Sequence, residues 1–326
     1  MSERIRLAVV GVGHLGRHHA TKILASQRTE LIALVDLDEA RAASVAAELD
    51  EKVLVYRDLE SLRGKIDAVV IAATTSAHEQ LAVQAASLGL HALIEKPIAP
   101  APEAAQRIID SMTSAGTVLQ VGHTERFNPA IQAVLGMNLA PLYVTAERLG
   151  PFSGRSFDVD VVLDLMIHDI DIVASMVPSE LIEVRAVGLP IITDETDMAS
   201  ARLMFADGTV AELKAGRASM EASRKLRMIT RERYVSIDCA AQEVKCVRRD
   251  PAPDGGAWPQ ISGEAIAVET HDALERQLDD FIDAITLGRQ PVVDGPQGLR
   301  AVAIARAVQE ALDAHSHARK PQVASS

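Results

Sequence analysis

Residues 11–16 read Gly-Val-Gly-His-Leu-Gly, and this glycine pattern constrains the fold more than any other feature of the chain. Residues 5–10, just before it, form a nearly continuous apolar run, as expected of a strand buried on both faces of a parallel sheet. A helix is expected after it, over residues 14–26. In such a unit the first glycine permits a tight turn, the second lets a pyrophosphate approach the backbone, and the third lets helix and strand pack closely. The pattern predicts a Rossmann domain whose cofactor loop comprises Gly11, Gly13, His14, Leu15 and Gly16.

Strand and helix patterns then alternate up to about residue 122. Further strands are expected at residues 30–35, 53–56, 68–72, 91–94 and 117–121, and further helices at residues 39–49, 78–88 and 103–114. Because strands and helices alternate, the strands should form one parallel sheet. We therefore expect an α/β Rossmann domain over residues 1–122.

After residue 122 the alternation fades, and short strands joined by turns replace it. Strands are expected at residues 142–149, 181–187, 199–205, 209–215, 226–230, 234–238 and 244–247, and amphipathic helices at residues 272–287 and 298–314. The Pro- and Gly-rich residues 250–263 are expected to form a mobile loop. Consecutive strands joined by short turns favour antiparallel pairing. Residues 123–326 are thus predicted to form an α+β domain with a mostly antiparallel open sheet.

Asp36 stands at the end of the second expected strand, about 20 residues after the glycine loop, as in dinucleotide-binding domains. A carboxylate at this position hydrogen-bonds the ribose hydroxyls of NAD. It also repels the 2′-phosphate of NADP, and the neighbouring Leu37 offers no positive charge to hold one. NAD is therefore predicted as the cofactor in preference to NADP.

Two further groups of polar residues follow strands of the first domain. Glu95, Lys96 and Pro97 come directly after the strand at residues 91–94, and Thr74 and His78 follow the strand at residues 68–72. Ligands of open α/β sheets bind beyond the carboxyl ends of the strands, so both groups are predicted to contribute to the cofactor site. The alternatives are a surface turn for Glu95-Lys96-Pro97 and a helix cap for His78. Lys96 is also a candidate to hydrogen-bond the reacting oxygen. A cis bond before Pro97 would orient that lysine.

Asp164 and His168 are four residues apart, which places them on one face of a helix about a turn apart. A carboxylate beside an imidazole fixes its orientation and stabilises its protonated form, as a general base requires. An ordinary surface pair or a core histidine is the alternative reading of this spacing. Asp169 and Asp171 add negative charge nearby, but no catalytic metal is expected, because hydride transfer with a lysine and a histidine needs none.

The composition excludes some classes of partner. The formal net charge of −12, without a dense block of Lys and Arg, argues against nucleic acid. The two cysteines, Cys239 and Cys246, suggest neither a disulfide framework nor a zinc site and are expected to be buried. No apolar run approaches the length of a membrane helix or a signal peptide, so a cytoplasmic protein without a membrane partner is expected.

Together these residues resemble the glucose-fructose oxidoreductase/inositol dehydrogenase/rhizopine catabolism (Gfo/Idh/MocA) family. The glycine loop, Thr74 with His78, Glu95-Lys96-Pro97, and Asp164 with His168 occur in the family's order, although Thr75 stands where many members have proline. The resemblance implies oxidation of a sugar-ring hydroxyl with NAD(P). It also implies that Lys96 is the motif lysine, His168 the proton acceptor and Asp164 its companion.

A narrower resemblance concerns residues 122–129, 149–155 and 161–169, which look like those of bacterial UDP-N-acetylglucosamine 3-dehydrogenases. Those enzymes make a 3-keto sugar for a transaminase in the lipid A precursor route. The resemblance implies a nucleotide-sugar substrate bound through Arg126, Arg155, Asp164 and His168. An exposed face on the second sheet would in addition favour a homodimer or homotetramer. Arg148, Arg217 and Arg224 are further candidates to bind an anionic substrate. A dehydrogenase of a free sugar or polyol such as myo-inositol, and a non-catalytic NAD(P)-binding regulator, remain as alternatives.

Overall fold

The computed structural model describes residues 4–50, 52–152, 159–252 and 258–319, and it divides the chain into two compact units. The first unit comprises residues 1–127 and 272–302, and the second comprises residues 128–271 and 303–326. The expected division after residue 122 lies close to the first of these boundaries. The sequence analysis did not predict that residues 272–302 belong to the first unit.

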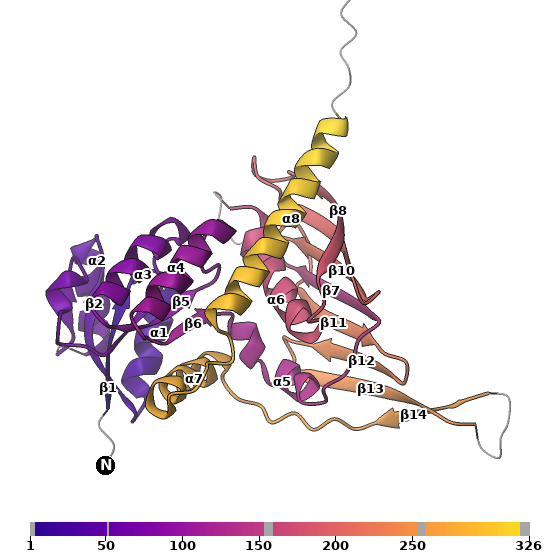
Figure 1. Cartoon of the computed structure of the whole chain (residues 1–326), viewed down its shortest axis with the longest axis horizontal. Coiled ribbons are helices and arrows are strands. Elements are labelled where there is room, and N and C mark those ends of the chain that lie inside the picture. Colours follow the sequence, from indigo (N-terminus) through magenta and orange to yellow (C-terminus); the bar gives the residue numbers. More distant parts are fainter. Residues whose placement is uncertain (1–3, 51, 153–158, 253–257, 320–326) are drawn as a thin grey trace, which may run out of the picture. The chain divides into compact units, whose positions relative to one another are not determined.

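The first unit is built around a six-stranded parallel sheet in the order β3-β2-β1-β4-β5-β6 (Figure 1). Its strands are β1 (Ile5–Val10), β2 (Thr29–Val35), β3 (Leu54–Tyr56), β4 (Ala68–Ile71), β5 (His91–Glu95) and β6 (Leu119–Gly122). The helices between them are α1 (His14–Ala25), α2 (Glu39–Leu49), α3 (His78–Ser87) and α4 (Pro102–Ser114). The β1 and β4 side chains are almost all buried, which confirms the expectation from their apolar runs.

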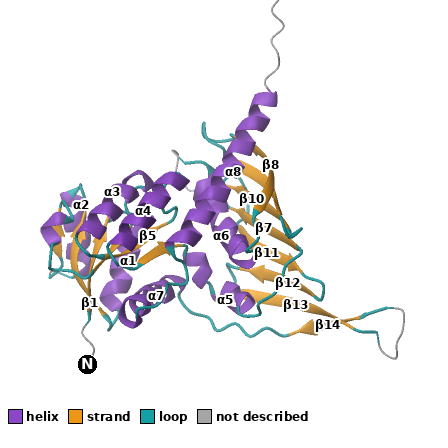
Figure 2. Ribbon diagram, in the orientation of Figure 1, coloured by secondary structure: helices purple, strands orange, loops and turns teal. Residues whose placement is uncertain are grey.

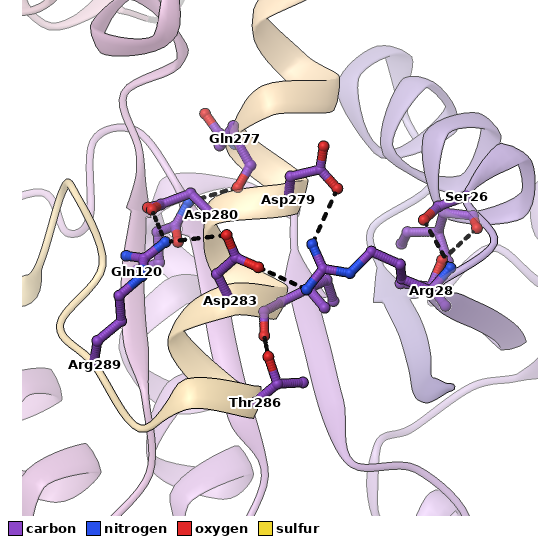
Figure 3. Close-up of polar contacts among 12 residues, drawn as sticks. Ser26, Arg28, Gln120, Gln277, Asp279, Asp280, Asp283, Thr286 and Arg289 are labelled. Atoms are coloured by element: carbon purple, nitrogen blue, oxygen red, sulfur yellow. Dashed lines mark hydrogen bonds and ion pairs between the residues drawn. The ribbon is translucent and has the colours of Figure 1, made fainter. Parts of the chain in front are cut away.

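The helix α7 (Ala273–Leu287) completes this unit. Its apolar residues Leu278, Phe281 and Ile282 belong to the same buried cluster as β1 and α1 residues. Its acidic face binds two arginines, as Figure 3 shows: Asp279 and Asp283 bind Arg28, and Asp280 binds Arg289.

The segment after α7 lies along the edge strand β6. The Val121 N–H donates to the Val293 carbonyl, and Gln120 forms a bridge with Asp294. This pairing covers an edge that would otherwise expose unpaired backbone groups. The return of the C-terminal segment therefore completes the parallel sheet.

The second unit holds an eight-stranded sheet in the order β14-β13-β12-β11-β7-β10-β9-β8 (Figure 2). Its strands are β7 (Tyr143–Leu149), β8 (Leu181–Leu189), β9 (Met198–Phe205), β10 (Val210–Gly216), β11 (Ser223–Ile229), β12 (Arg233–Asp238), β13 (Glu243–Asp250) and β14 (Gln260–Glu264). Only β7 and β10 pair in parallel, so the predicted mostly antiparallel sheet is confirmed. Cys239 and Cys246 are buried, also as predicted.

Helices of the second unit cover one face of this sheet. They are α5 (Pro129–Leu135), α6 (Ile167–Met176) and the later turns of α8 (Gly295–Arg319), as Figure 2 shows. On the β7 strand, buried residues alternate with partly exposed ones, as expected of a sheet covered on one side.

The expectation of a mobile loop over residues 250–263 was wrong in part. Residues 260–264 form the strand β14, which pairs with β13 in an antiparallel register that includes Val247 opposite Gly263. The segment has one large apolar residue, Ile261, and that side chain is mostly exposed. The strand is therefore held by backbone pairing with β13, which leaves little hydrophobic pattern in the sequence to predict it.

Candidate active site

The glycine loop has the geometry that a dinucleotide requires. Gly11 has φ +84°, and a Cβ there would lie 2.6 Å from the backbone of Ala73. A Cβ on Gly16 would lie 1.8 Å from the Gly11 carbonyl oxygen, so both positions require glycine. At Gly13, in contrast, no described atom lies within 4 Å of the Cβ position, which leaves open space at the N-terminus of α1.

The N-terminus of α1 suits an anion. Its N-cap residue is Gly13, which has no side chain to cap the helix, and the first turn contains no acidic residue. The amide groups at this end carry partial positive charge and can donate to phosphate oxygens. His14 and Leu15 are exposed on this first turn, where the sequence analysis placed them in the cofactor loop.

A cavity of about 450 Å³ extends from the glycine loop along the carboxyl ends of the neighbouring strands. Its lining includes Gly11, Gly13, Asp36, Arg41, Arg57 and Thr74. The cavity is within the size range of small-molecule sites. Together with the space beside Gly13, it offers room for a dinucleotide, and it is lined by Asp36 and Thr74, two of the residues predicted to contact the cofactor.

Asp36 is a buried carboxylate with several donors. Its Oδ2 atom accepts the Val12 N–H at 2.9 Å, and its Oδ1 atom accepts the Asp38 N–H at 2.9 Å and an Arg41 N–H at 2.7 Å. Burial by itself raises the pKa of Asp36, but these hydrogen bonds and the Arg41 charge outweigh burial and lower the pKa. The group is thus ionised at neutral pH. Because a carboxylate offers about four acceptor positions, Oδ2 retains one for a further donor.

Arg41 is a site residue that the sequence analysis missed. Its charge compensates Asp36 inside the same cavity, at a salt-bridge distance of 2.7 Å. Arg41 lies in the first turn of α2, five residues after Asp36, and that spacing alone does not distinguish it from an exposed helix residue.

His78 lies buried between two loops rather than on an open surface. Its Nδ1 atom is 3.0 Å from the Pro97 carbonyl oxygen and its Nε2 atom is 3.1 Å from the Ala73 carbonyl oxygen. Burial lowers the pKa of His78, so the neutral ring donates its single N–H to one of the two carbonyls. The contact ties the loop after β4 to the loop after β5. The bond between Lys96 and Pro97 is cis, as the sequence analysis suggested.

Glu95 and Lys96 differ in exposure. The Glu95 side chain is buried and lies 2.7 Å from His19, whereas Lys96 is half-buried at the carboxyl end of β5. Lys96 belongs to the first unit and directly precedes Pro97, whose carbonyl oxygen His78 contacts.

Asp164 and His168 belong to the second unit. Asp164 lies in a π-helical turn, Val162–Met166, and His168 is the second residue of α6, which continues it. Asp160 caps the turn by accepting the N–H groups of Val162 and Leu163. Both predicted residues are thus helical and partly exposed, and π-helical turns occur frequently at functional sites.

The candidate arginines differ in their surroundings. Arg148 forms a buried, two-point ion pair with Asp169, with nitrogen–oxygen distances of 2.9 and 3.2 Å. Arg217 is buried against Asp197. Arg126 is buried in the first unit and Arg224 is exposed on β11, while Arg155 lies outside the described residues. Arg148 and Arg217 are therefore engaged by carboxylates of the chain itself.

Two negative findings concern the described residues only. None of the helices described here is long and apolar enough to span a bilayer. In the same part of the chain, no cluster of three or more His, Cys, Asp or Glu side chains is arranged to hold a metal ion.

The parallel sheet, the glycine loop at a helix N-terminus and the acidic residue that follows β2 define a dinucleotide-binding protein of the Rossmann class. Residues 5–123 match the model of an oxidoreductase family with an NAD-binding Rossmann fold, Gfo/Idh/MocA. The chain belongs to this family and is an oxidoreductase.

Two relatives match over most of their length. The chain is 39% identical to UDP-N-acetylglucosamine 3-dehydrogenase of Acidithiobacillus ferrooxidans over 95% of this chain and 98% of that one. A solved structure of that enzyme has a TM-score of 0.88, with 96% of this chain and 99% of the other covered. Identity to scyllo-inositol 2-dehydrogenase (NAD(+)) of Bacillus subtilis is 28%, over 90% of each chain.

Proposed function

We propose that this protein oxidises the C3 hydroxyl of UDP-N-acetylglucosamine to a ketone with NAD as the hydride acceptor. The observation that carries the proposal is the 39% identity, along nearly the whole of both chains, to an enzyme named for that reaction. In the reaction the hydroxyl loses a proton to a base, the ring carbon loses a hydride, and NAD⁺ becomes NADH.

The chain's own residues have three roles in this proposal. His168 accepts the hydroxyl proton, and Asp164 orients its ring. Lys96 donates a hydrogen bond to the same oxygen as negative charge develops, an effect worth a few kcal/mol in a site that excludes water. The bound cofactor supplies the hydride acceptor. Asp164 lies on a capped π-helical turn and His168 on the first turn of α6, which continues it, and this helical backbone supports a fixed orientation for both side chains.

NAD is proposed in preference to NADP. The support is the ionised Asp36 in the cavity beside the glycine loop, because a carboxylate at this position accepts ribose hydroxyls and repels a 2′-phosphate. Gly11, Gly13, Gly16 and the N-terminal amides of α1 are proposed to hold the pyrophosphate.

Arg126 and Arg155 are proposed to bind the diphosphate of the substrate. A guanidinium matches paired phosphate oxygens in a two-point geometry. Arg148 and Arg217 are no longer candidates in this proposal, because each is buried against a carboxylate. Their positive charge is already compensated.

The test is a substrate screen that follows the absorbance of reduced nicotinamide across UDP-sugars, free N-acetylglucosamine and free polyols. We expect activity with UDP-N-acetylglucosamine and much slower reaction of the free sugar. A preference for a free polyol would favour the second candidate, to which the similarity with scyllo-inositol 2-dehydrogenase (NAD(+)) points. Cofactor binding without turnover of any substrate would favour a regulator.

A cytoplasmic homodimer or homotetramer also remains a proposal. Support for self-association comes from the sheet face opposite the helices, where Val187, Leu189, Ile229 and Tyr234 are each at least 40% exposed. Exposed apolar side chains mark protein–protein contacts, and here they lie at two places on this face, on β8 and on β11 with β12. Light scattering of the purified protein tests the proposal, and a monomer at micromolar concentration would contradict it.

A further inference from the structure

One buried pair of polar side chains in the first unit, His19 and Glu95, has no part in the function proposed above. His19, on the second turn of α1, lies with Nε2 2.7 Å from Oε1 of Glu95, the last residue of β5. The exposed fractions of the two side chains are 1% and 6%. The pair therefore connects the helix that follows the glycine loop to the residue next to Lys96.

The second oxygen of Glu95 continues this connection. Its Oε2 atom accepts the backbone N–H of Lys96 at 3.2 Å. The neighbouring strand also leaves space for the carboxylate, because Gly122 lies opposite Glu95 in the sheet. A Cβ on Gly122 would lie 2.8 Å from Cδ and 2.9 Å from Oε1 of Glu95, so glycine is required there.

The protonation states of the pair follow from its surroundings. Burial by itself raises the pKa of Glu95, but the hydrogen bond from His19 and the charges of His19 and Lys96 outweigh burial and lower the pKa. An ionised carboxylate only accepts hydrogen bonds, so Nε2 of His19 carries the proton that it donates. A charge buried at this depth is costly unless it is held by such donors.

We propose that His19 is a positioning residue: by fixing the Glu95 carboxylate, it fixes the Lys96 backbone and hence the place from which the lysine side chain acts. This inference rests on the role proposed for Lys96. The reason for expecting an effect on rate is geometric. A displacement of about 1 Å in a group that acts on the reacting atoms can cost about 10²-fold in rate.

The test compares three variants. His19→Leu removes the donor, and His19→Gln restores an amide N–H near the position of Nε2. Thr29→Val is the matched control, because the buried Thr29 hydroxyl also holds α1, through the Ile23 carbonyl, but Thr29 begins β2 whereas Lys96 follows the end of β5, at the opposite edge of the parallel sheet. Thermal unfolding of each variant provides the comparison of stability.

The first readout needs no substrate. Hydrogen exchange of the Lys96 amide reports the bond to Glu95. The next residue, Pro97, has no amide hydrogen, so it does not add to the exchange measured at this position. We expect exchange at least about tenfold faster in His19→Leu than in the unmodified protein at equal global stability, and near-normal exchange in His19→Gln and Thr29→Val. Unchanged exchange in His19→Leu would overturn the proposed link.

The second readout is steady-state kinetics with UDP-N-acetylglucosamine, or with whichever substrate the screen identifies. We expect kcat to fall about tenfold or more in His19→Leu, with KM and the NAD dissociation constant within about threefold, and His19→Gln to recover most of the loss. A parallel loss of NAD affinity, or a loss of kcat no larger than in Thr29→Val, would contradict the positioning role. If no substrate is found, the proposed function fails while hydrogen exchange still decides the link.

Gly122→Ala provides a second variant in case His19→Leu does not fold. The added methyl group would lie 2.8 Å from Cδ and 2.9 Å from both Oε1 and the backbone Cα of Glu95, so it displaces the carboxylate together with the end of β5, while His19 is left unchanged. The same two readouts should change in the same direction. Normal Lys96 amide exchange and normal kcat in a folded Gly122→Ala protein would overturn the proposal.

Discussion

The Nε atom of Arg217 lies 2.7 Å from Oδ1 of Asp197, and both side chains are almost completely buried. Asp197 also accepts three backbone N–H groups, from Ile191, Ile192 and Thr193. Arg217 donates in addition to the Val159 carbonyl at 2.9 Å. The pair therefore anchors the connection between β8 and β9 to β10, which gives Arg217 a structural role in place of the substrate contact that the sequence suggested.

Replacing either partner should destabilise the protein. Arg217→Ala leaves a buried carboxylate without its counter-charge, and breaking a buried pair in this way costs about 3–5 kcal/mol in the free energy of unfolding. Chemical denaturation measures the loss. Arg231→Ala, at an exposed turn position, is the control and should change stability by no more than about 0.5 kcal/mol. A loss below about 1 kcal/mol for Arg217→Ala would show that the pair contributes little.

The same pair predicts a dependence of stability on pH. Burial raises the pKa of Asp197, but the three backbone hydrogen bonds and Arg217 outweigh it and hold the pKa well below its ordinary value of 3.8. Because the pKa of Asp197 is lower in the folded state, the unfolded state binds the proton more tightly. The contribution of this carboxylate to the free energy of unfolding is therefore complete above the ordinary pKa of 3.8 and is lost as the pH falls below that value. The free energy of unfolding should fall more steeply below about pH 4 in the unmodified protein than in Asp197→Asn. Equal slopes would contradict this assignment.

Cofactor choice should depend on Asp36. In Asp36→Ala the repulsion of a 2′-phosphate is gone and Arg41, now without its carboxylate partner, faces the same cavity. Calorimetric titration should show NAD bound about tenfold more weakly, the scale of a lost charge-assisted hydrogen bond, and NADP bound more tightly than before. Asp36→Ala combined with Arg41→Ala should lose the gain for NADP. Equal affinity of the unmodified protein for both cofactors would refute the role of Asp36.

Substitutions at Lys96 and His168 should separate chemistry from binding. Lys96→Met and His168→Ala should each lower kcat by roughly 10²-fold or more if these groups act on the transferring proton. NAD affinity should be retained in both. The exposed Lys52→Met variant controls for loss of a surface charge and should keep normal turnover. Near-normal kcat in either site variant would remove that residue from the mechanism.

The sequence predicted the features that local pattern determines. Continuous apolar runs located the strands of the parallel sheet, and the glycine loop located the cofactor cavity. The strand β14 was missed because its pairing with β13, and not its own hydrophobic pattern, holds it. The amphipathic pattern of α7 shows that one face is buried, but it does not identify the unit against which that face packs.

The sequence analysis did not predict which charged and polar side chains are partners when they are far apart in the chain. His19 and Glu95 are 76 residues apart, and Arg217 and Asp197 are 20 apart, the first just after β10 and the second just before β9. In the sequence, an arginine that binds a buried carboxylate cannot be told from one that binds a phosphate, because the residue type is the same. Only the fold shows that Arg148 and Arg217 bind the buried carboxylates of Asp169 and Asp197.

The last prediction concerns the nucleotide part of the substrate. If the diphosphate is bound by guanidinium groups, binding of the uridine diphosphate helps to position the ring, and free N-acetylglucosamine should react far more slowly than the UDP-sugar. Arg126→Ala and Arg155→Ala should then each raise KM for the UDP-sugar by about one to two powers of ten, with little effect on any slow reaction of the free sugar. The exposed Arg231→Ala variant controls for the change in net charge. Steady-state kinetics on both substrates decide the matter, since comparable kcat/KM values for the free sugar and the UDP-sugar in the unmodified enzyme would instead support a dehydrogenase of free sugars or polyols.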